Sequence, residues 1–112
     1  MFQVLAVLAL AGPAAAGGPT VPDTAAASHM GQTVTLDCNV VNVKHAHNGM
    51  TYVDCGGLFP NMLASLVVFA KDTAAVGDLD AYKGKHLLVR GKLEPYKDKP
   101  EIVLTERAQI QR

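Results

Sequence analysis

Hydrophobic and polar residues alternate in the first half of the chain, in the pattern of a β-strand with one buried face. Between Thr33 and Val43, one face of the predicted strand is apolar and carries Val34, Leu36, Cys38 and Val40. The alternation changes phase at Val41, so that Val41 and Val43 place the apolar positions on the opposite face. We therefore expect a long strand that bends or contains a bulge.

Two further strands and a helix are predicted after this strand. Met50–Cys55 predicts the second strand, and the nearly continuous apolar run Leu63–Ala70 predicts a third strand that is buried on both faces. Between them, the segment Gly56–Asn61 is rich in residues that break regular structure and predicts a loop. The segment Lys71–Tyr82 then predicts a helix, which Gly77 weakens in its middle.

The segment Gly84–Leu104 predicts a β-hairpin, because Pro95–Pro100 separates two apolar runs and Asp98 is suited to a tight turn. Before the first strand, Asp23–His29 predicts a helix of at most two turns, which Gly31 ends. The predicted order is a short helix, three strands, a helix and two strands, which is the order of an OB-fold barrel. We therefore predict a mostly all-β fold, a five-stranded OB-fold-like barrel with a short N-terminal helix and a helix between strands 3 and 4.

The N-terminal residues have the composition of a targeting segment. No charged side chain precedes Asp23, the apolar run Val4–Ala11 is too short to span a bilayer, and Ala14–Ala16 offers small residues to a signal peptidase. The predicted organisation is a cleaved signal peptide at 1–16, a flexible linker at 17–22 and an OB-fold-like domain at 23–112. The protein would then be exported, periplasmic or secreted, without membrane insertion after cleavage. The alternative is a disordered Ala/Gly/Pro-rich leader, because no Lys or Arg precedes the apolar run.

The two cysteines, Cys38 and Cys55, are expected to form a disulfide bond in an exported protein. If Lys44–Gly49 is the turn of a symmetric hairpin, Cys38 lies directly opposite Cys55, and Val40 lies opposite Val53. Opposed side chains on neighbouring antiparallel strands are close enough for a disulfide. The alternative is a pair of buried thiols in one layer of the core.

Several stretches of the chain resemble a family of small, often exported bacterial domains with an OB-fold similar to that of nucleic-acid-binding proteins. The resemblance rests on ASHMG at 27–31, TYVDCGGLFPN at 51–61, VVFAKD at 67–72, YKGKHLLVRGKLEPYKDKPEIVL at 82–104, and Gln109–Ile110. The chain departs from the family pattern at Cys38 and Asp98, where such domains usually have glycine. The resemblance implies the OB fold and, through it, a binding function.

In an OB barrel the ligand crosses the second and third strands between the first and last hairpin loops. The candidate ligand-binding residues at these places are Lys44, His45, His47, Tyr52, Phe59, Tyr96, Lys97 and Lys99. Aromatic rings offer stacking surfaces to bases and lysines offer contacts to phosphates, so single-stranded nucleic acid is one expected partner. A formal net charge of +0 excludes a global attraction to polyanions, so a protein, peptide or small-molecule ligand is the alternative. Lysines on an edge hairpin also protect against aggregation.

Metal binding and catalysis are not expected. His45 and His47 form an H-x-H pair, but two histidines do not complete a metal site, and His29 and His86 are distant in the sequence. The chain has no nucleophile motif, no glycine-rich phosphate loop and no carboxylate cluster beside an arginine. We therefore expect a non-catalytic binding module with no cofactor, and the sequence does not predict an oligomeric state.

Overall fold

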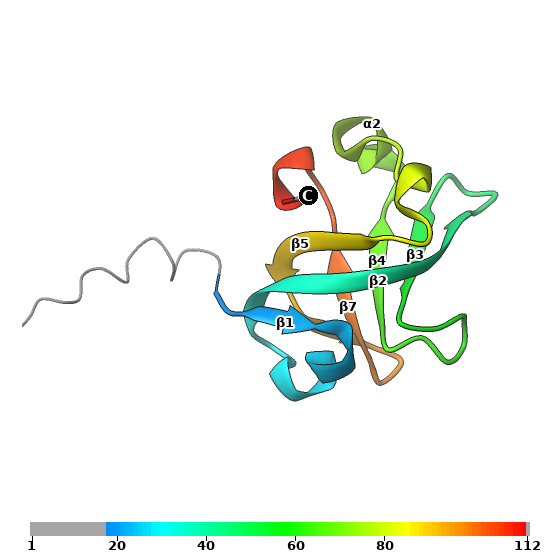
Figure 1. Cartoon of the computed structure of the whole chain (residues 1–112). Helices are drawn as coiled ribbons and strands as arrows, with labels where there is room; N and C mark the ends of the chain where they lie inside the picture. The colour runs from blue at the N-terminus through cyan, green and yellow to red at the C-terminus, as the bar shows by residue number, and fades with distance from the viewer. Residues whose placement is uncertain (1–17, 112) are drawn as a thin grey trace, which may run out of the picture.

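The computed structural model of the protein describes residues 18–111 and shows a mostly β fold with a few short helical turns (Figure 1). One mixed sheet contains seven strands. The strands are β1 (Thr20–Pro22), β2 (Thr33–His45), β3 (Thr51–Cys55), β4 (Ala64–Val68), β5 (His86–Lys92), β6 (Glu94–Tyr96) and β7 (Lys99–Val103). The helical elements are η2 (Asp23–His29), η3 (Ala70–Asp72), α2 (Thr73–Val76), η4 (Asp80–Tyr82) and η5 (Arg107–Gln109).

The sheet has the order β1-β2-β3-β4-β7-β6, and β5 pairs with β2. Strands β2, β3 and β4 form an antiparallel meander, and β7 lies parallel to β4. The all-β prediction is confirmed, whereas the prediction of five strands is wrong. The sheet is also not closed, because no ladder joins β5 to β7 in the described part of the chain.

The open edge arises where the predicted final hairpin divides. Buried Leu93 interrupts the first arm of this hairpin, so that the arm becomes β5 and β6. β5 pairs along its whole length with β2, so only the β6 part of this arm pairs with β7. Where β5 passes β7, an ideal Cβ on Gly91 would lie 2.5 Å from Cγ2 of Ile102, so the side chain of Ile102 packs directly on the Gly91 backbone.

The long strand β2 bends in its middle, as the phase change of its pattern predicts. Its register with β3 shifts between Val40 and Asn42, which is the expected bulge. The residues 33–39 pair with β5, and the residues from Val40 onward pair with β3. In Figure 1, β2 accordingly crosses the molecule from β1 at one end to β3 at the other.

The buried core lies between the inner faces of these strands. Its fully buried large side chains are Val34, Leu36, Val40, Val53, Leu66, Val68, Val76, Leu79, Leu87, Leu93, Ile102 and Leu104. The strand β4 is buried at every position, as expected from its continuous apolar run. Val76 at the end of α2 and Leu79 after it anchor the predicted helix between strands β4 and β5 to this core. This helix is one turn long, because Gly77 ends it with a φ of 88°.

The N-terminal segment joins the fold earlier than expected. Thr20–Pro22, within the predicted linker, forms β1 and pairs in parallel with β2, and Val21 is buried. The predicted short helix is the 3-10 helix η2. The predicted signal peptide at 1–16 lies outside the described residues. Among the residues that are described, no helix is long and apolar enough to cross a membrane.

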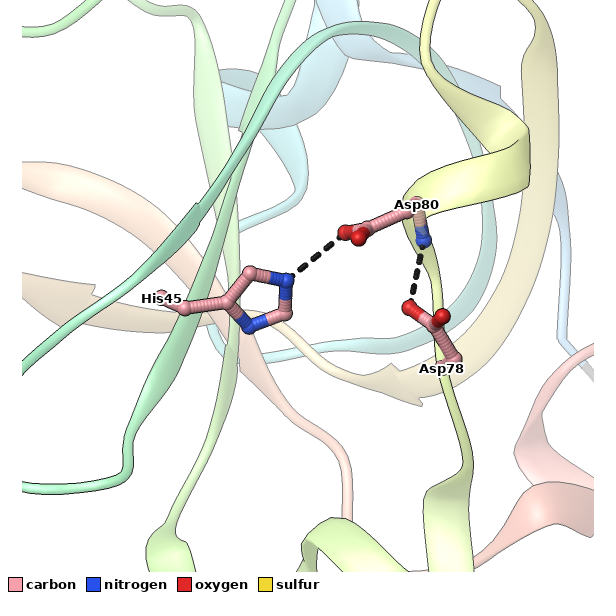
Figure 2. A group of neighbouring side chains, drawn as sticks. All are labelled: His45, Asp78 and Asp80. Carbon is pink, nitrogen blue, oxygen red and sulfur yellow. Dashed lines mark hydrogen bonds and ion pairs between the residues drawn. The ribbon is translucent and has the colours of Figure 1, made fainter.

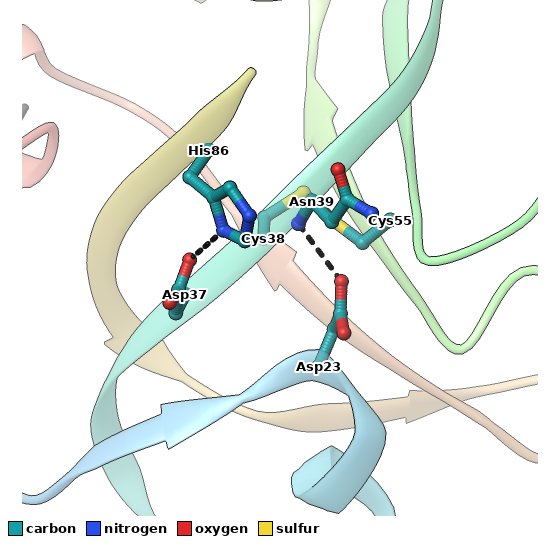
Figure 3. Close-up of a disulfide and its surroundings, with 6 residues drawn as sticks. All are labelled: Asp23, Asp37, Cys38, Asn39, Cys55 and His86. Carbon is teal, nitrogen blue, oxygen red and sulfur yellow. Dashed lines mark hydrogen bonds and ion pairs between the residues drawn. A yellow bond between two sulfur atoms is a disulfide. The ribbon is translucent and has the colours of Figure 1, made fainter. Parts of the chain in front are cut away.

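The expected disulfide joins Cys38 to Cys55, with 5.1 Å between the two Cα atoms (Figure 3). The expected register is wrong, because Cys55 lies opposite Val40, and Cys38 lies opposite Leu87 of β5. The cause is the position of the turn, because His45 pairs with Thr51, which displaces the ladder by three positions from the expected register. The bulge between Val40 and Asn42 restores only one of these positions. The bend at the bulge brings Cys38 beside the end of β3.

Candidate ligand-binding groove

Strand alternation places a row of polar side chains on the outer face of β3, β4 and β7. Asp54 lies opposite Ser65, Ser65 lies beside Glu101, and Glu101 lies opposite Glu94 of β6. Because neighbouring residues of a strand point to opposite faces, the residues next to this row enter the core. Tyr52, two residues before Asp54, therefore belongs to the same outer face.

A groove of about 340 Å³ opens on this face. We call it the aromatic groove. It is lined by Lys44, Tyr52, Asp54, Phe59, Met62, Ser65, Tyr96, Lys97 and Glu101. An adjoining hollow of about 240 Å³ extends it toward Pro60, Lys99 and Pro100. The groove is thus built from the sheet, from the loop between β3 and β4, and from the tip of the β6–β7 hairpin.

Aromatic rings and lysines form the walls of the aromatic groove. Phe59 is 64% exposed and Tyr96 is 55% exposed, so both rings are accessible from the groove. The ammonium nitrogen of Lys44 lies 5.0 Å from the centre of the Phe59 ring and 5.9 Å from that of Tyr52. Lys97 lies 5.4 Å from the ring of Tyr96. Each wall therefore combines a flat apolar surface with a positive charge.

The turn that carries Tyr96 and Lys97 has a constrained backbone. Lys97 and Asp98 have φ values of 49° and 67°, in the left-handed region that Asp tolerates better than most residues. Pro95 lies opposite Pro100 at the base of the turn. Two left-handed residues in succession match the twist of a tight hairpin, so they hold the tip beside the groove.

The floor of the aromatic groove is acidic and partly desolvated. Asp54 is only 4% exposed and Ser65 only 9% exposed. Burial raises the pKa of Glu101 above its usual value, and the neighbouring charge of Glu94 raises this pKa further. The floor therefore contrasts with the walls in both charge and exposure.

The structure brings most of the predicted ligand-binding residues to one place. Six of the eight predicted residues line the aromatic groove or the hollow beside it, namely Lys44, Tyr52, Phe59, Tyr96, Lys97 and Lys99. His45 and His47 lie elsewhere. His45 points to η4, and His47 is exposed in the turn after β2.

Sequence reasoning missed four groove residues, Asp54, Met62, Ser65 and Glu101. Alternation with Tyr52 would have placed Asp54 on the outer face. Ser65 gave no such signal, because it is the one polar residue within the apolar run that forms β4.

A second polar cluster, outside the aromatic groove, contains His45, Asp78 and Asp80 (Figure 2). Nε2 of His45 lies 2.7 Å from a carboxylate oxygen of Asp80, and Nδ1 lies 3.2 Å from the hydroxyl oxygen of Thr51. The carboxylate of Asp78 accepts a hydrogen bond of 2.9 Å from the backbone N–H of Asp80. His45, Asp78 and Asp80 are all exposed, and protein partners already occupy both imidazole nitrogens of His45. The contact between His45 and Asp80 ties the end of β2 to η4.

The other histidines of the described region are remote from this cluster. His29 lies within hydrogen-bond distance of Gln32, and His86 lies 2.7 Å from a carboxylate oxygen of Asp37, as Figure 3 shows. The structure therefore brings neither residue to the H-x-H pair.

Comparison of the chain with protein-family models, with curated proteins and with solved structures gives no match.

Proposed function

We propose that this protein is a non-catalytic, exported OB-fold-like module that binds single-stranded nucleic acid in the aromatic groove. The strand order supports the proposed fold. Three meandering strands, a fourth that returns beside the first, and a fifth that lies parallel to the third correspond to β2, β3, β4, β5 and β7. The missing β5–β7 ladder is the departure from a closed barrel.

The position of the aromatic groove is the observation that carries the proposed function. It lies on the outer face of β3 and β4, between the loop after β3 and the tip of the β6–β7 hairpin. An OB barrel binds its ligand on the corresponding face. The exposed rings of Phe59 and Tyr96 suit stacking on bases, and Lys44, Lys97 and Lys99 suit contacts to phosphates.

Export is supported by the disulfide. A buried Cys38–Cys55 bridge is typical of an oxidising compartment, either the periplasm or the exterior of the cell. A cleaved N-terminal signal peptide would deliver the chain to that compartment.

A second candidate ligand is an extended peptide. Its support comes from the hollow beside the groove, where Phe59, Pro60, Met62 and Pro100 offer apolar contacts. Salt separates the two candidates, because phosphate binding releases counterions whereas apolar recognition does not.

A titration of the purified protein with fluorescent single-stranded DNA and RNA at two salt concentrations tests the proposal. Three lysine contacts to a single strand predict that a fourfold rise in salt weakens binding by roughly tenfold or more. Phe59→Ala and Tyr96→Ala should each weaken binding by about tenfold, the cost of one lost stacking contact. Phe69→Ala is the matched aromatic control, because Phe69 is 41% exposed and does not line the groove.

The contribution of the groove lysines is tested with the same titration. Lys97→Ala should weaken binding and reduce its dependence on salt, whereas Lys83→Ala, an exposed lysine that does not line the groove, should change neither. Absence of salt-sensitive binding at protein concentrations of about 10–100 µM would exclude nucleic acid as the ligand.

A further inference from the structure

Two buried polar side chains on the floor of the aromatic groove have no hydrogen-bond partner among residues 18–111. Asp54 is 4% exposed and Ser65 is 9% exposed, and both line the groove. In residues 18–111, neither the carboxylate of Asp54 nor the hydroxyl of Ser65 forms a hydrogen bond with another residue. Buried polar groups are nearly always paired, so an unpaired pair that faces a groove points to a ligand that completes it.

The groove defines what kind of ligand group could reach Asp54. A carboxylate accepts hydrogen bonds and donates none, so its partner must present donors. The exposed rings of Phe59 and Tyr96 stand at the walls, and a planar group that stacks on either ring can direct one edge to the floor. The partner is therefore a flat group with hydrogen-bond donors along one edge.

The charges on the walls decide between two flat donor groups, a nucleobase and the guanidinium of an arginine side chain. Lys44 and Lys97 lie over the aromatic rings and would repel a cationic guanidinium. A neutral base meets no such repulsion, and its phosphate is attracted to the same lysines. The lysines of the walls favour a nucleotide, whose base can present its donors to the floor.

We infer that Asp54, assisted by Ser65, reads the Watson–Crick edge of a base and gives the aromatic groove a preference for guanine. Guanine presents two adjacent donors, N1–H and the N2 amino group, which match the two oxygens of a carboxylate. Cytosine and adenine present one amino donor beside an acceptor. Thymine and uracil present one donor between two carbonyl oxygens, which an ionised carboxylate repels. This inference rests on the proposed nucleic-acid function and specifies the base that the groove selects.

The test compares single-stranded thymidine oligonucleotides of equal length that carry one central guanine, inosine, cytosine or thymine. Fluorescence anisotropy at constant salt measures the dissociation constant of each. We expect the guanine strand to bind about tenfold more tightly than the all-thymine strand. Inosine lacks the N2 amino group and should fall between them.

Two variants connect this preference to the floor. Asp54→Asn replaces one acceptor by a donor, so it should abolish the preference for guanine, because the amide no longer matches the two donors of guanine and no longer repels the carbonyl oxygens of thymine. Ser65→Ala should reduce the preference to a smaller extent. Asp78→Asn, at an exposed aspartate that does not line the groove, is the matched control and should retain the full preference. Circular dichroism and thermal unfolding identify any variant that fails to fold. If Asp54→Asn does not fold, the change in guanine preference of Ser65→Ala tests the inference instead.

These experiments distinguish a failure of the base preference from a failure of the proposed nucleic-acid function. Equal binding of all four strands by the wild-type protein would overturn the base preference and leave the proposed function intact. A preference that persists in both Asp54→Asn and Ser65→Ala would show that other groups read the base. If no strand binds but an arginine-rich peptide does, both the base preference and the nucleic-acid function are refuted.

Discussion

Removal of the Cys38–Cys55 disulfide should destabilise the fold strongly. The bridge joins residues separated by 17 positions in the sequence. In the chain-entropy model, opening a loop of this length increases the entropy of the unfolded state enough to lower the free energy of unfolding by about 3 kcal/mol at 25 °C. Both cysteines are 0% exposed, so the Cys38→Ala/Cys55→Ala variant also loses some packing. For a domain of this size, 3 kcal/mol corresponds to a fall in Tm of about 10–20 °C.

Urea denaturation followed by circular dichroism measures this loss, with three samples compared. They are the oxidised protein, the same protein unfolded, reduced and refolded in dithiothreitol, and the double alanine variant. The reduced protein keeps both sulfur atoms, so its loss reports the cross-link, and any additional loss in the variant reports packing. A reduced protein within about 1 kcal/mol of the oxidised one would refute the loop-entropy argument for this bridge.

Three further substitutions test separate features of the fold by urea or thermal unfolding. Asp23→Ala should lower the free energy of unfolding by about 1.5–3 kcal/mol, because the buried carboxylate accepts a 2.8 Å hydrogen bond from the backbone of β2, and a loss below about 0.5 kcal/mol would contradict this. Gly91→Val should cost about 1–3 kcal/mol by overpacking against Ile102, and a second change, Ile102→Leu, should recover part of it. Glu101→Gln should stabilise the protein at neutral pH, where ionised Glu101 is desolvated and close to Glu94. The raised pKa means that the folded state holds this proton more tightly, so wild-type stability falls as pH rises from about 4.5 through the folded pKa, and the advantage of Glu101→Gln should vanish below pH 4.5. A Glu101→Gln advantage that does not depend on pH would contradict the assignment.

The central strands could be predicted from the sequence because their side chains follow a clear period. β2 and β3 alternate, β4 is continuously apolar, and each predicted strand overlaps the observed one. The bend of β2 was also predictable, since a bulge changes the phase of the alternation at Val41.

The strands β1 and β6 were not predictable in the same way. Each has three residues, which is too short for a period, and each contains a proline. The partner of a strand is also invisible to periodicity. β5 carries the pattern expected of one arm of a hairpin, yet its ladder is with β2, from which it is far in the sequence.

The residues of the candidate site also differ in how far they could be predicted from the sequence. Tyr96, Lys97 and Phe59 could be proposed because loops of an OB barrel carry its ligand contacts. The acidic floor could not be predicted, because the row of side chains from Asp54 to Glu101 depends on the register of the three strands β3, β4 and β7. A shift of one residue in any ladder would turn part of this row into the core.

The disulfide and the aromatic groove are also connected through the loop after β3. Cys55 is the last residue of β3, and the loop that follows it carries Phe59. The backbone N–H of Gly56 donates a 2.9 Å hydrogen bond to Asn39, and that of Leu63 donates a 2.8 Å hydrogen bond to Cys55. The bridge therefore fixes the base of the loop that holds the exposed ring.

A loop with a fixed base would present Phe59 to a ligand with little entropy left to lose, which is how preorganisation raises affinity. If the aromatic groove binds oligonucleotides as we propose, the double alanine variant should bind them more weakly than wild type even at temperatures at which it is fully folded. Phe59→Ala should also cost less affinity in that variant than in wild type, because a mobile ring contributes less stacking. A double-mutant cycle of these two changes measures the coupling directly. Additive effects, with each change costing the same affinity in either background, would show that the bridge stabilises the fold without positioning the groove.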